Sequence, residues 1–144
     1  GVACVLHSER PDAKVYAAEP ETASPLATSF AAGRASTFDA WRASFVDGAG
    51  GRSVLGSMWP LLEAWVSESL VVSLDDAARA MRLVADRIHV IAEGAAACAI
   101  AAAVSPAMAA RCHQKIVAVV SGGNIDLKRF AELVGACGDN RPHP

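Results

Sequence analysis

The stretch KIVAVVSGGNID, residues 115 to 126, contains the features that decide the fold. Five apolar residues at 116–120 predict a buried β-strand, and the SGGN turn, residues 121–124, separates it from a helix predicted over 126–134. Such a turn has two interpretations. In the first, it only connects a strand to a helix. In the second, it supports the polar edge of a ligand, because ligands bind beyond the carboxyl ends of parallel strands and glycine allows close approach to the backbone.

Helix and strand patterns alternate along the rest of the chain. Strands are predicted at 14–18 and 67–73, and an extended loop is predicted at 33–56, with one turn around 38–43. Helices are predicted at 22–32 before Gly33, within GSMWPLLEAWV (56–66), at 93–103 and around 107–113. A further helix is predicted to follow Ser73, which caps it, and to bury the stripe Ala77, Met81, Val84 and Ile88. The pattern predicts an α/β fold with an open, mostly parallel sheet and flanking helices. Three such apolar strands leave open edges, so we expect them to be part of a larger sheet.

Composition limits the classes of partner. The chain has 144 residues, a length typical of one domain, with 53% hydrophobic residues, 19% charged residues and a net charge of -2. This balance is not basic enough for a nucleic-acid-binding protein. Residues 94–110 carry no charge, but they are mostly alanine and include Ser105 and Pro106, so we expect no membrane span.

The cysteines indicate a reducing compartment, and we expect the cytoplasm. Cys4, Cys98, Cys112 and Cys137 show neither a CxxC pair nor a zinc-ligand spacing. Cys98 lies in an apolar helical pattern, where we expect it to pack as a small hydrophobic residue. The chain begins at Gly1, without methionine and without a signal region.

Several common catalytic patterns are absent from the sequence. There is no GxxxxGK[ST] phosphate loop and no GxSxG nucleophile elbow. The glycine-rich residues 48–52 have the wrong spacing for a dinucleotide fingerprint, so we interpret them as a flexible turn. The four histidines show no HExxH or paired spacing, which gives a zinc site little support.

Four segments together resemble the C-terminal half of the serine/threonine dehydratase family of pyridoxal-phosphate (PLP) enzymes, which also includes serine racemase. They are VYAAEPETAS (15–24), SFVDGAGG (44–51), IHVIAEGAAACAIAAA (88–103) and IVAVVSGGNID (116–126). Their order and separations match the family across nearly the whole chain. The resemblance implies the fold-type-II architecture, in which the cofactor lies between a large and a small domain, and we expect this chain to be part of the large domain.

The resemblance also implies cofactor-binding residues. The SGGN turn consists of Ser121, Gly122, Gly123 and Asn124. The family's serine at the place of Ser121 faces the pyridine nitrogen of the cofactor. A neutral hydroxyl can donate to an unprotonated nitrogen, which makes the ring a weaker electron sink and favours loss of a β-hydroxyl.

Three further residues match family positions near the cofactor. Glu93 matches a glutamate near the ring, although Gly94 follows it where proline is common. The alternative for Glu93 is a carboxylate near the positive end of a helix dipole. Asp47 and Gly48 match the loop that lines one side of the cofactor.

A divalent-cation site is implied less clearly. Glu19 matches a carboxylate that, with the carbonyl at Ala23, helps to hold a cation in some relatives. The next ligand position is Pro25, whose side chain cannot coordinate a metal.

The family's Schiff-base lysine, asparagine loop and tetraglycine phosphate cup have no counterpart here. Lys14, Lys115 and Lys128 lie outside any motif that resembles the Schiff-base segment, so no catalytic residue is assigned to this chain. In relatives, GVACVL would follow the phosphate cup, so Gly1 resembles a cut. We therefore expect residues 1–137 to be the C-terminal portion of a catalytic domain and residues 138–144 to be a polar tail.

The function that the resemblance implies is that of a PLP-dependent ammonia-lyase acting on serine or threonine to give a 2-oxo acid and ammonia. The expected partners are a small amino acid, the N-terminal half of the enzyme, and further copies in a homo-oligomer. Two alternatives remain: an amino-acid racemase of the same family, and a non-catalytic fragment that binds a partner half.

Overall fold

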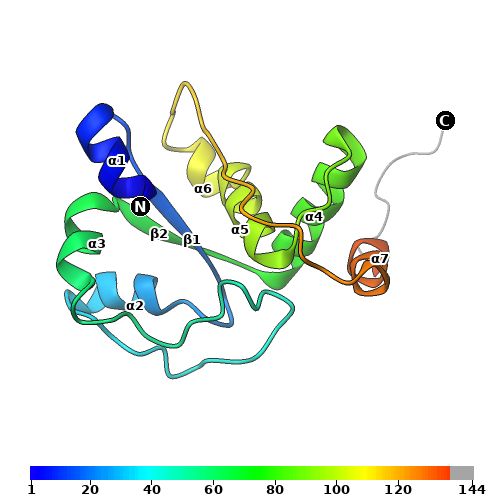
Figure 1. Ribbon diagram of the computed structural model, residues 1–144, viewed down its shortest axis with the longest axis horizontal. Helices are drawn as coiled ribbons and strands as arrows, with labels where there is room; N and C mark the ends of the chain where they lie inside the picture. The colour runs from blue at the N-terminus through cyan, green and yellow to red at the C-terminus, as the bar shows by residue number, and fades with distance from the viewer. Residues whose placement is uncertain (137–144) are drawn as a thin grey trace. The chain divides into compact units, whose positions relative to one another are not determined.

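The computed structural model describes residues 1–136, so the predicted tail at 138–144 lies outside the described residues. These residues form two compact units, one from Gly1 to Val72 and one that begins at Ser73. A small parallel sheet lies in the first unit, and helices account for the regular structure of the second (Figure 1). The predicted α/β class with flanking helices is confirmed.

The sheet of the first unit consists of two parallel strands, β1 (Tyr16–Pro20) and β2 (Glu68–Val72). Their register pairs Tyr16 with Glu68 and Pro20 with Val72. The observed β1 begins two residues later than predicted and continues through Pro20. Proline is tolerated at this end of a strand, where its missing N–H removes no interior ladder bond.

Three helices accompany the sheet in this unit: α1 (Val2–Glu9), α2 (Pro25–Ala32) and α3 (Trp59–Trp65). The predicted helix start at residue 22 is wrong. Proline disfavours the helical conformation of the residue before it, so Ser24 is not helical and α2 begins at Pro25. The predicted end is confirmed, since Gly33 adopts the left-handed conformation at φ 64°.

Apolar side chains of α2 and α3 form the core of the first unit. Leu26, Trp59 and Val66 are buried together, and Phe30 meets Trp59 edge to face with ring centroids 5.4 Å apart. Ala17 of β1 packs against the same cluster, so the helices cover this face of the sheet.

The predicted loop after Gly33 is confirmed, and specific contacts order it. The Trp41 indole donates to the Gly50 carbonyl at 2.8 Å, and the Arg52 guanidinium lies 4.1 Å from the Trp41 ring centroid. Thr37 and Ser53 form an isolated antiparallel bridge. These contacts close the loop on itself and fix the turn that contains residues 47–50.

The second unit contains α4 (Leu74–Ile88), α5 (Gly94–Ala103), α6 (Pro106–Ala109) and α7 (Leu127–Ala136). The apolar stripe of α4 is largely as predicted, since Ala77, Met81 and Val84 are buried. Ile88 is 60% exposed, so its predicted burial is wrong. The helix ends there, because His89 takes the left-handed conformation at φ 56° and turns the chain away.

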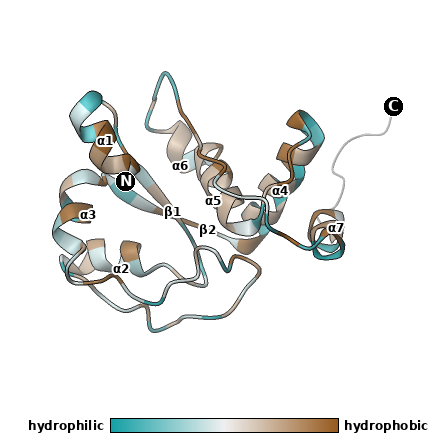
Figure 2. Ribbon diagram, in the orientation of Figure 1, coloured by the Kyte–Doolittle hydropathy of each residue, from teal (hydrophilic) through white to brown (hydrophobic). Residues whose placement is uncertain are grey.

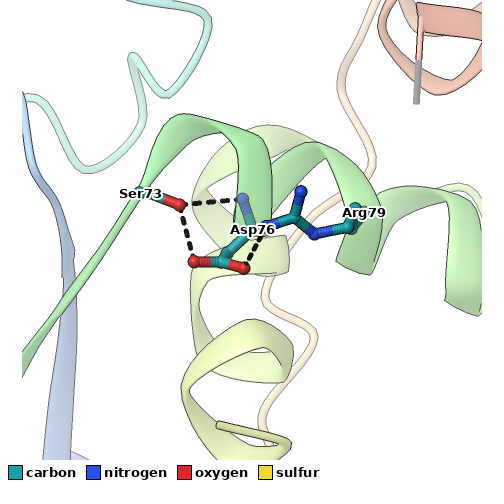
Figure 3. A network of polar contacts seen from close by, with 3 residues as sticks. All are labelled: Ser73, Asp76 and Arg79. Carbon is teal, nitrogen blue, oxygen red and sulfur yellow. Dashed lines mark hydrogen bonds and ion pairs between the residues drawn. The ribbon is translucent and has the colours of Figure 1, made fainter. Parts of the chain in front are cut away.

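The predicted cap of α4 is confirmed in detail (Figure 3). The Ser73 hydroxyl accepts from the Asp76 amide at 3.0 Å and donates to the Asp76 carboxylate at 2.6 Å. Arg79 adds an ion pair to that carboxylate at 2.6 Å. Hydrogen bonds from Ser73 and Arg79 hold the pKa of Asp76 below its usual range.

The predicted strand at 116–120 is the main correction to the fold. These residues form no strand within the described part of the chain, and Ile116, Val117, Val119 and Val120 are exposed. Figure 2 shows this extended segment as hydrophobic where the chain leaves the loop after α6. A β-strand needs hydrogen bonds from a neighbour, and no neighbouring strand pairs with it among residues 1–136.

Candidate functional site

The SGGN turn is attached to the segment that leads into α5. The Glu93 amide donates to the Gly122 carbonyl at 3.1 Å, and the Ile125 amide donates to the Gly123 carbonyl at 3.0 Å. Glu93 is also the N-cap residue of α5, whose first turn begins at Gly94. The turn is therefore fixed at the start of a buried helix.

The two glycines of the turn pack closely against the same segment. A Cβ at Gly122 would lie 2.5 Å from the Glu93 Oε1 atom, and a Cβ at Gly123 would lie 2.5 Å from the Ile91 carbonyl oxygen. Both distances are shorter than real Cβ contacts. Glycine here serves first to bring two parts of the protein together, a role that the sequence pattern did not distinguish from ligand approach.

The polar side chains of the turn remain available to a ligand. Ser121 and Asn124 are exposed, and neither side chain forms a hydrogen bond with another residue in the range 1–136. The Glu93 carboxylate is half-buried beside Gly122. The turn that carries Ser121 and Asn124 is thus attached, through Gly122, beside the Glu93 carboxylate at the start of α5.

Asp47 and Gly48 lie in an exposed turn of the first unit. The Asp47 side chain accepts from the Gly48 amide at 2.8 Å, and the Asp47 carbonyl accepts from the Gly50 amide at 3.0 Å. Val46, just before the turn, is buried and anchors it. The Asp47 carboxylate therefore stabilises its own turn.

Glu19, the predicted metal ligand, is bound by hydrogen-bond donors of the protein. Its carboxylate accepts from the amides of Leu26 at 2.9 Å and Ala27 at 2.8 Å, and from the Ser69 hydroxyl at 2.7 Å. Ala23 is buried in the turn that follows β1. Sequence reasoning missed Ser69, although a serine within an apolar strand signals a polar partner on that face of the sheet.

Other candidates for metal binding or nucleophilic catalysis are limited. Within residues 1–136, no three His, Cys, Asp or Glu side chains are grouped closely enough to hold a metal ion. Burial raises the pKa of the Cys98 thiol to about 11, so at neutral pH this residue packs as a neutral hydrophobic group, as predicted.

None of the helices described has the length and hydropathy that a membrane span needs.

Comparison with protein families decides the classification. The family model for pyridoxal-phosphate dependent enzymes matches residues 1–122, a range that ends within the SGGN turn. The chain belongs to this family. The resemblance predicted from the four segments is confirmed.

Curated relatives point to two activities within the family. The chain is 29% identical over 136 residues to the catabolic L-threonine dehydratase of Escherichia coli, covering 94% of this chain and 41% of that protein. It is 33% identical over 132 residues to the serine racemase of Oryza sativa subsp. indica, covering 88% of this chain and 38% of that protein. The chain thus spans about two-fifths of the length of these relatives.

Solved structures agree on the fold. The structure of maize serine racemase matches 94% of this chain and 43% of its own chain, with a TM-score of 0.81 and 29% identity. The crystal structure of a T.th. threonine deaminase matches 88% of this chain and 42% of its own, with a TM-score of 0.80 and 29% identity. The chain therefore has the fold of one part of a fold-type-II PLP enzyme.

Proposed function

We propose that this chain is the C-terminal part of a PLP-dependent ammonia-lyase that acts on serine or threonine. The observation that carries the proposal is the exposed Ser121 hydroxyl, which no residue in the range 1–136 engages, on a turn fixed to the start of α5. Similarity to the threonine dehydratase of E. coli supports the reaction class.

The residues of the SGGN turn fit one edge of this cofactor. A pyridine nitrogen accepts a hydrogen bond in its plane, and the Ser121 hydroxyl can donate one. When bound, the cofactor supplies the electron sink that makes the α-proton of an amino acid acidic. With the cofactor bound, Ser121 would leave the ring nitrogen unprotonated, whereas a carboxylate at this position would hold a proton there. A weaker sink favours prompt loss of the β-hydroxyl over repeated exchange of the α-proton.

Glu93 and Asn124 are proposed to support this contact. Glu93 holds the Gly122 carbonyl through its backbone amide, so its backbone fixes the turn and its half-buried carboxylate remains beside it. Asp47 and Gly48 are proposed to line another side of the cofactor. The base and the covalent anchor belong to a part of the enzyme outside this chain.

The absence of a matched lysine has a direct test. None of Lys14, Lys115 and Lys128 lies in a motif like the Schiff-base segment, so this chain alone should form no stable covalent link to the cofactor. Treatment with PLP and borohydride, followed by peptide mass spectrometry, should leave no single lysine labelled stoichiometrically. Saturable labelling of one of the three would overturn the assignment.

The reaction itself is tested at Ser121 in the enzyme assembled from both parts. The Ser121→Asp variant should raise incorporation of solvent deuterium at the α-carbon relative to 2-oxo acid formation. Ser121→Ala should leave the nitrogen unpartnered, which costs about 1–3 kcal/mol if the nitrogen is buried. Ser57→Asp, at an exposed turn of the first unit, is the matched control and should leave the ratio unchanged. An unchanged ratio in Ser121→Asp, with cofactor still bound, would mean that Ser121 only shapes the turn.

A racemase is the second candidate, because the rice serine racemase is 33% identical to this chain. The two activities share α-proton removal and differ in the next step, which is loss of the β-hydroxyl or reprotonation on the opposite face. Accumulation of pyruvate from L-serine supports the lyase, and accumulation of D-serine supports the racemase.

The setting of the enzyme forms part of the same proposal. A reducing compartment such as the cytoplasm suits the free thiols of Cys4, Cys98 and Cys112. We also propose that the chain pairs with the N-terminal half of the enzyme and that the enzyme forms homo-oligomers. Exposed apolar residues at 116–120 favour such association.

A further inference from the structure

The Glu19 carboxylate joins three elements of the first unit. Glu19 lies in β1, where it pairs with Val71, and its side chain is half-buried. Ser69 of β2 lies opposite Ala17, two residues before Glu19, so the side chains of Ser69 and Glu19 share one face of the sheet. From this face the carboxylate reaches the amides of Leu26 and Ala27 in the first turn of α2.

All three partners of this carboxylate are hydrogen-bond donors. Its Oε1 atom accepts from the Leu26 amide, and its Oε2 atom accepts from the Ala27 amide and the Ser69 hydroxyl, at distances of 2.7–2.9 Å. Free amides at a helix N-terminus carry partial positive charge and stabilise an anion. Glu19 thus accepts from the first-turn amides in place of the N-cap residue, because the Ser24 side chain makes no cap hydrogen bond.

A divalent cation does not fit this arrangement. Calcium and magnesium require about six or more oxygen ligands, and a cation on Glu19 would face the amide hydrogens of Leu26 and Ala27. Pro25 offers no side-chain oxygen, and the described residues contain no group of three carboxylate, histidine or cysteine ligands. Coordination by Glu19 would require its present hydrogen bonds to break.

The middle of α2 is held by a second side chain. The buried Ser29 hydroxyl donates to the Pro25 carbonyl at 2.7 Å and accepts from the Ser36 amide at 2.9 Å. Ser29 therefore ties α2 to the loop that follows Gly33. Side chains of the protein therefore hold the first turn and the middle of α2.

We infer that Glu19 is an internal counter-charge that locks α2 to the sheet in place of the divalent cation that the family resemblance implies at this position. The first unit then needs no metal to hold the segment between β1 and α2. This lock is independent of the reaction proposed above.

Hydrogen exchange measured by mass spectrometry on the full 144-residue chain tests the lock, with peptides that cover the first turn of α2. Glu19→Gln should accelerate exchange of the Leu26 and Ala27 amides about tenfold, because one charge-assisted acceptor is lost. Ser69→Ala, which keeps the carboxylate, should accelerate it by a smaller factor of about threefold. Glu63→Gln, at an exposed position of α3, is the matched control and should leave this exchange unchanged.

Metal dependence is measured in the same experiment. Exchange in the unmodified chain should be the same with EDTA, with magnesium and with calcium, each cation at about 5 mM. Slower exchange with either cation, lost in Glu19→Gln and kept in Glu63→Gln, would overturn the inference and restore Glu19 as a ligand. Unchanged α2 exchange in both Glu19→Gln and Ser69→Ala would also overturn it. If Glu19→Gln does not fold, Ser69→Ala and the cation series decide the outcome.

Discussion

Two extended apolar segments of this chain have opposite surroundings. In β1, Tyr16–Pro20 pairs with β2 along its whole length, and Leu70 and Val72 of the partner strand are buried. Residues 116–120 are more apolar than β1, but they pair with no strand among residues 1–136, and Val117 is 88% exposed. Sequence alone predicted a strand in both places, and a buried one at 116–120.

The difference shows that apolar β-type residues specify an extended conformation without specifying a partner. β1 finds its partner about 50 residues later, after a connection that contains α2 and α3. The segment at 116–120 ends in the SGGN turn, which is held by Glu93 even without a neighbouring strand. The candidate site is therefore anchored from the side of α5.

The largest expected contrast is between a buried residue of β2, the strand that pairs with β1, and an exposed residue of 116–120. Leu70→Ala should lower the free energy of unfolding by about 2–4 kcal/mol, because it leaves a cavity beside the sheet. Val117→Ala should change it by less than about 0.5 kcal/mol, because Val117 contacts mainly solvent. Urea unfolding measures both values. Similar costs for the two variants would show that 116–120 is buried in solution.

A second contrast lies within the SGGN turn. Gly123→Ala should lower the free energy of unfolding by about 2 kcal/mol, because the new Cβ would meet the backbone carbonyl of Ile91. That carbonyl cannot move without shifting the chain. Gly122→Ala should cost about half as much, since its Cβ would meet the end of the Glu93 side chain, which can rotate away. Urea unfolding of the two variants ranks them, and the reverse order would contradict this geometry.

A third experiment asks whether 116–120 mediates self-association. We expect the isolated chain to associate through this segment, and Val117→Lys should weaken association about tenfold, because it places a charge on an unpaired apolar segment. Val2→Lys, at an exposed position of α1, is the control and should have little effect. Sedimentation velocity at tens of micromolar measures both. A stable monomer before any substitution would contradict the expectation.

The smallest expected effect concerns the cap of α4, whose contacts join Ser73, Asp76 and Arg79 of the same helix start. Ser73→Ala should cost about 1 kcal/mol of unfolding free energy. Because the pKa of Asp76 is lowered in the folded state, its contribution is present above its ordinary value of 3.8 and is lost as the pH falls below that value. The difference between Ser73→Ala and the unmodified chain should therefore shrink in acid. A difference that grows below about pH 4 would contradict the network in Figure 3.

Features that follow from neighbours in sequence were predictable. Ser73 caps α4 and Gly33 ends α2, because both depend on the residues of a single helical turn. The family of the enzyme was predictable from its four segments. α1 was not predicted, since none of its residues is buried and its sequence has no clear apolar stripe.

Features that depend on distant residues were not predictable. The partner of Glu19, Ser69, lies 50 residues away, and only the parallel register brings its hydroxyl to the carboxylate. Likewise, the packing of Gly123 against Ile91 depends on how the segment before α5 meets the turn. A resemblance could assign Glu19 to a metal, but only its three donors indicate the lock.

The alanine-rich surface of α5 has a mechanical consequence. Long side chains that interlock resist axial sliding, because each must leave its groove before the helix can move. In α5, Ala96, Ala97 and Ala101 present only short methyl groups to their surroundings, and α5 packs directly on α4. Small shear displacements along such a smooth interface require little repacking. Since the Glu93 amide holds the Gly122 carbonyl, the SGGN turn would travel with α5 as one body, and the reach of Ser121 could adjust without unfolding either element.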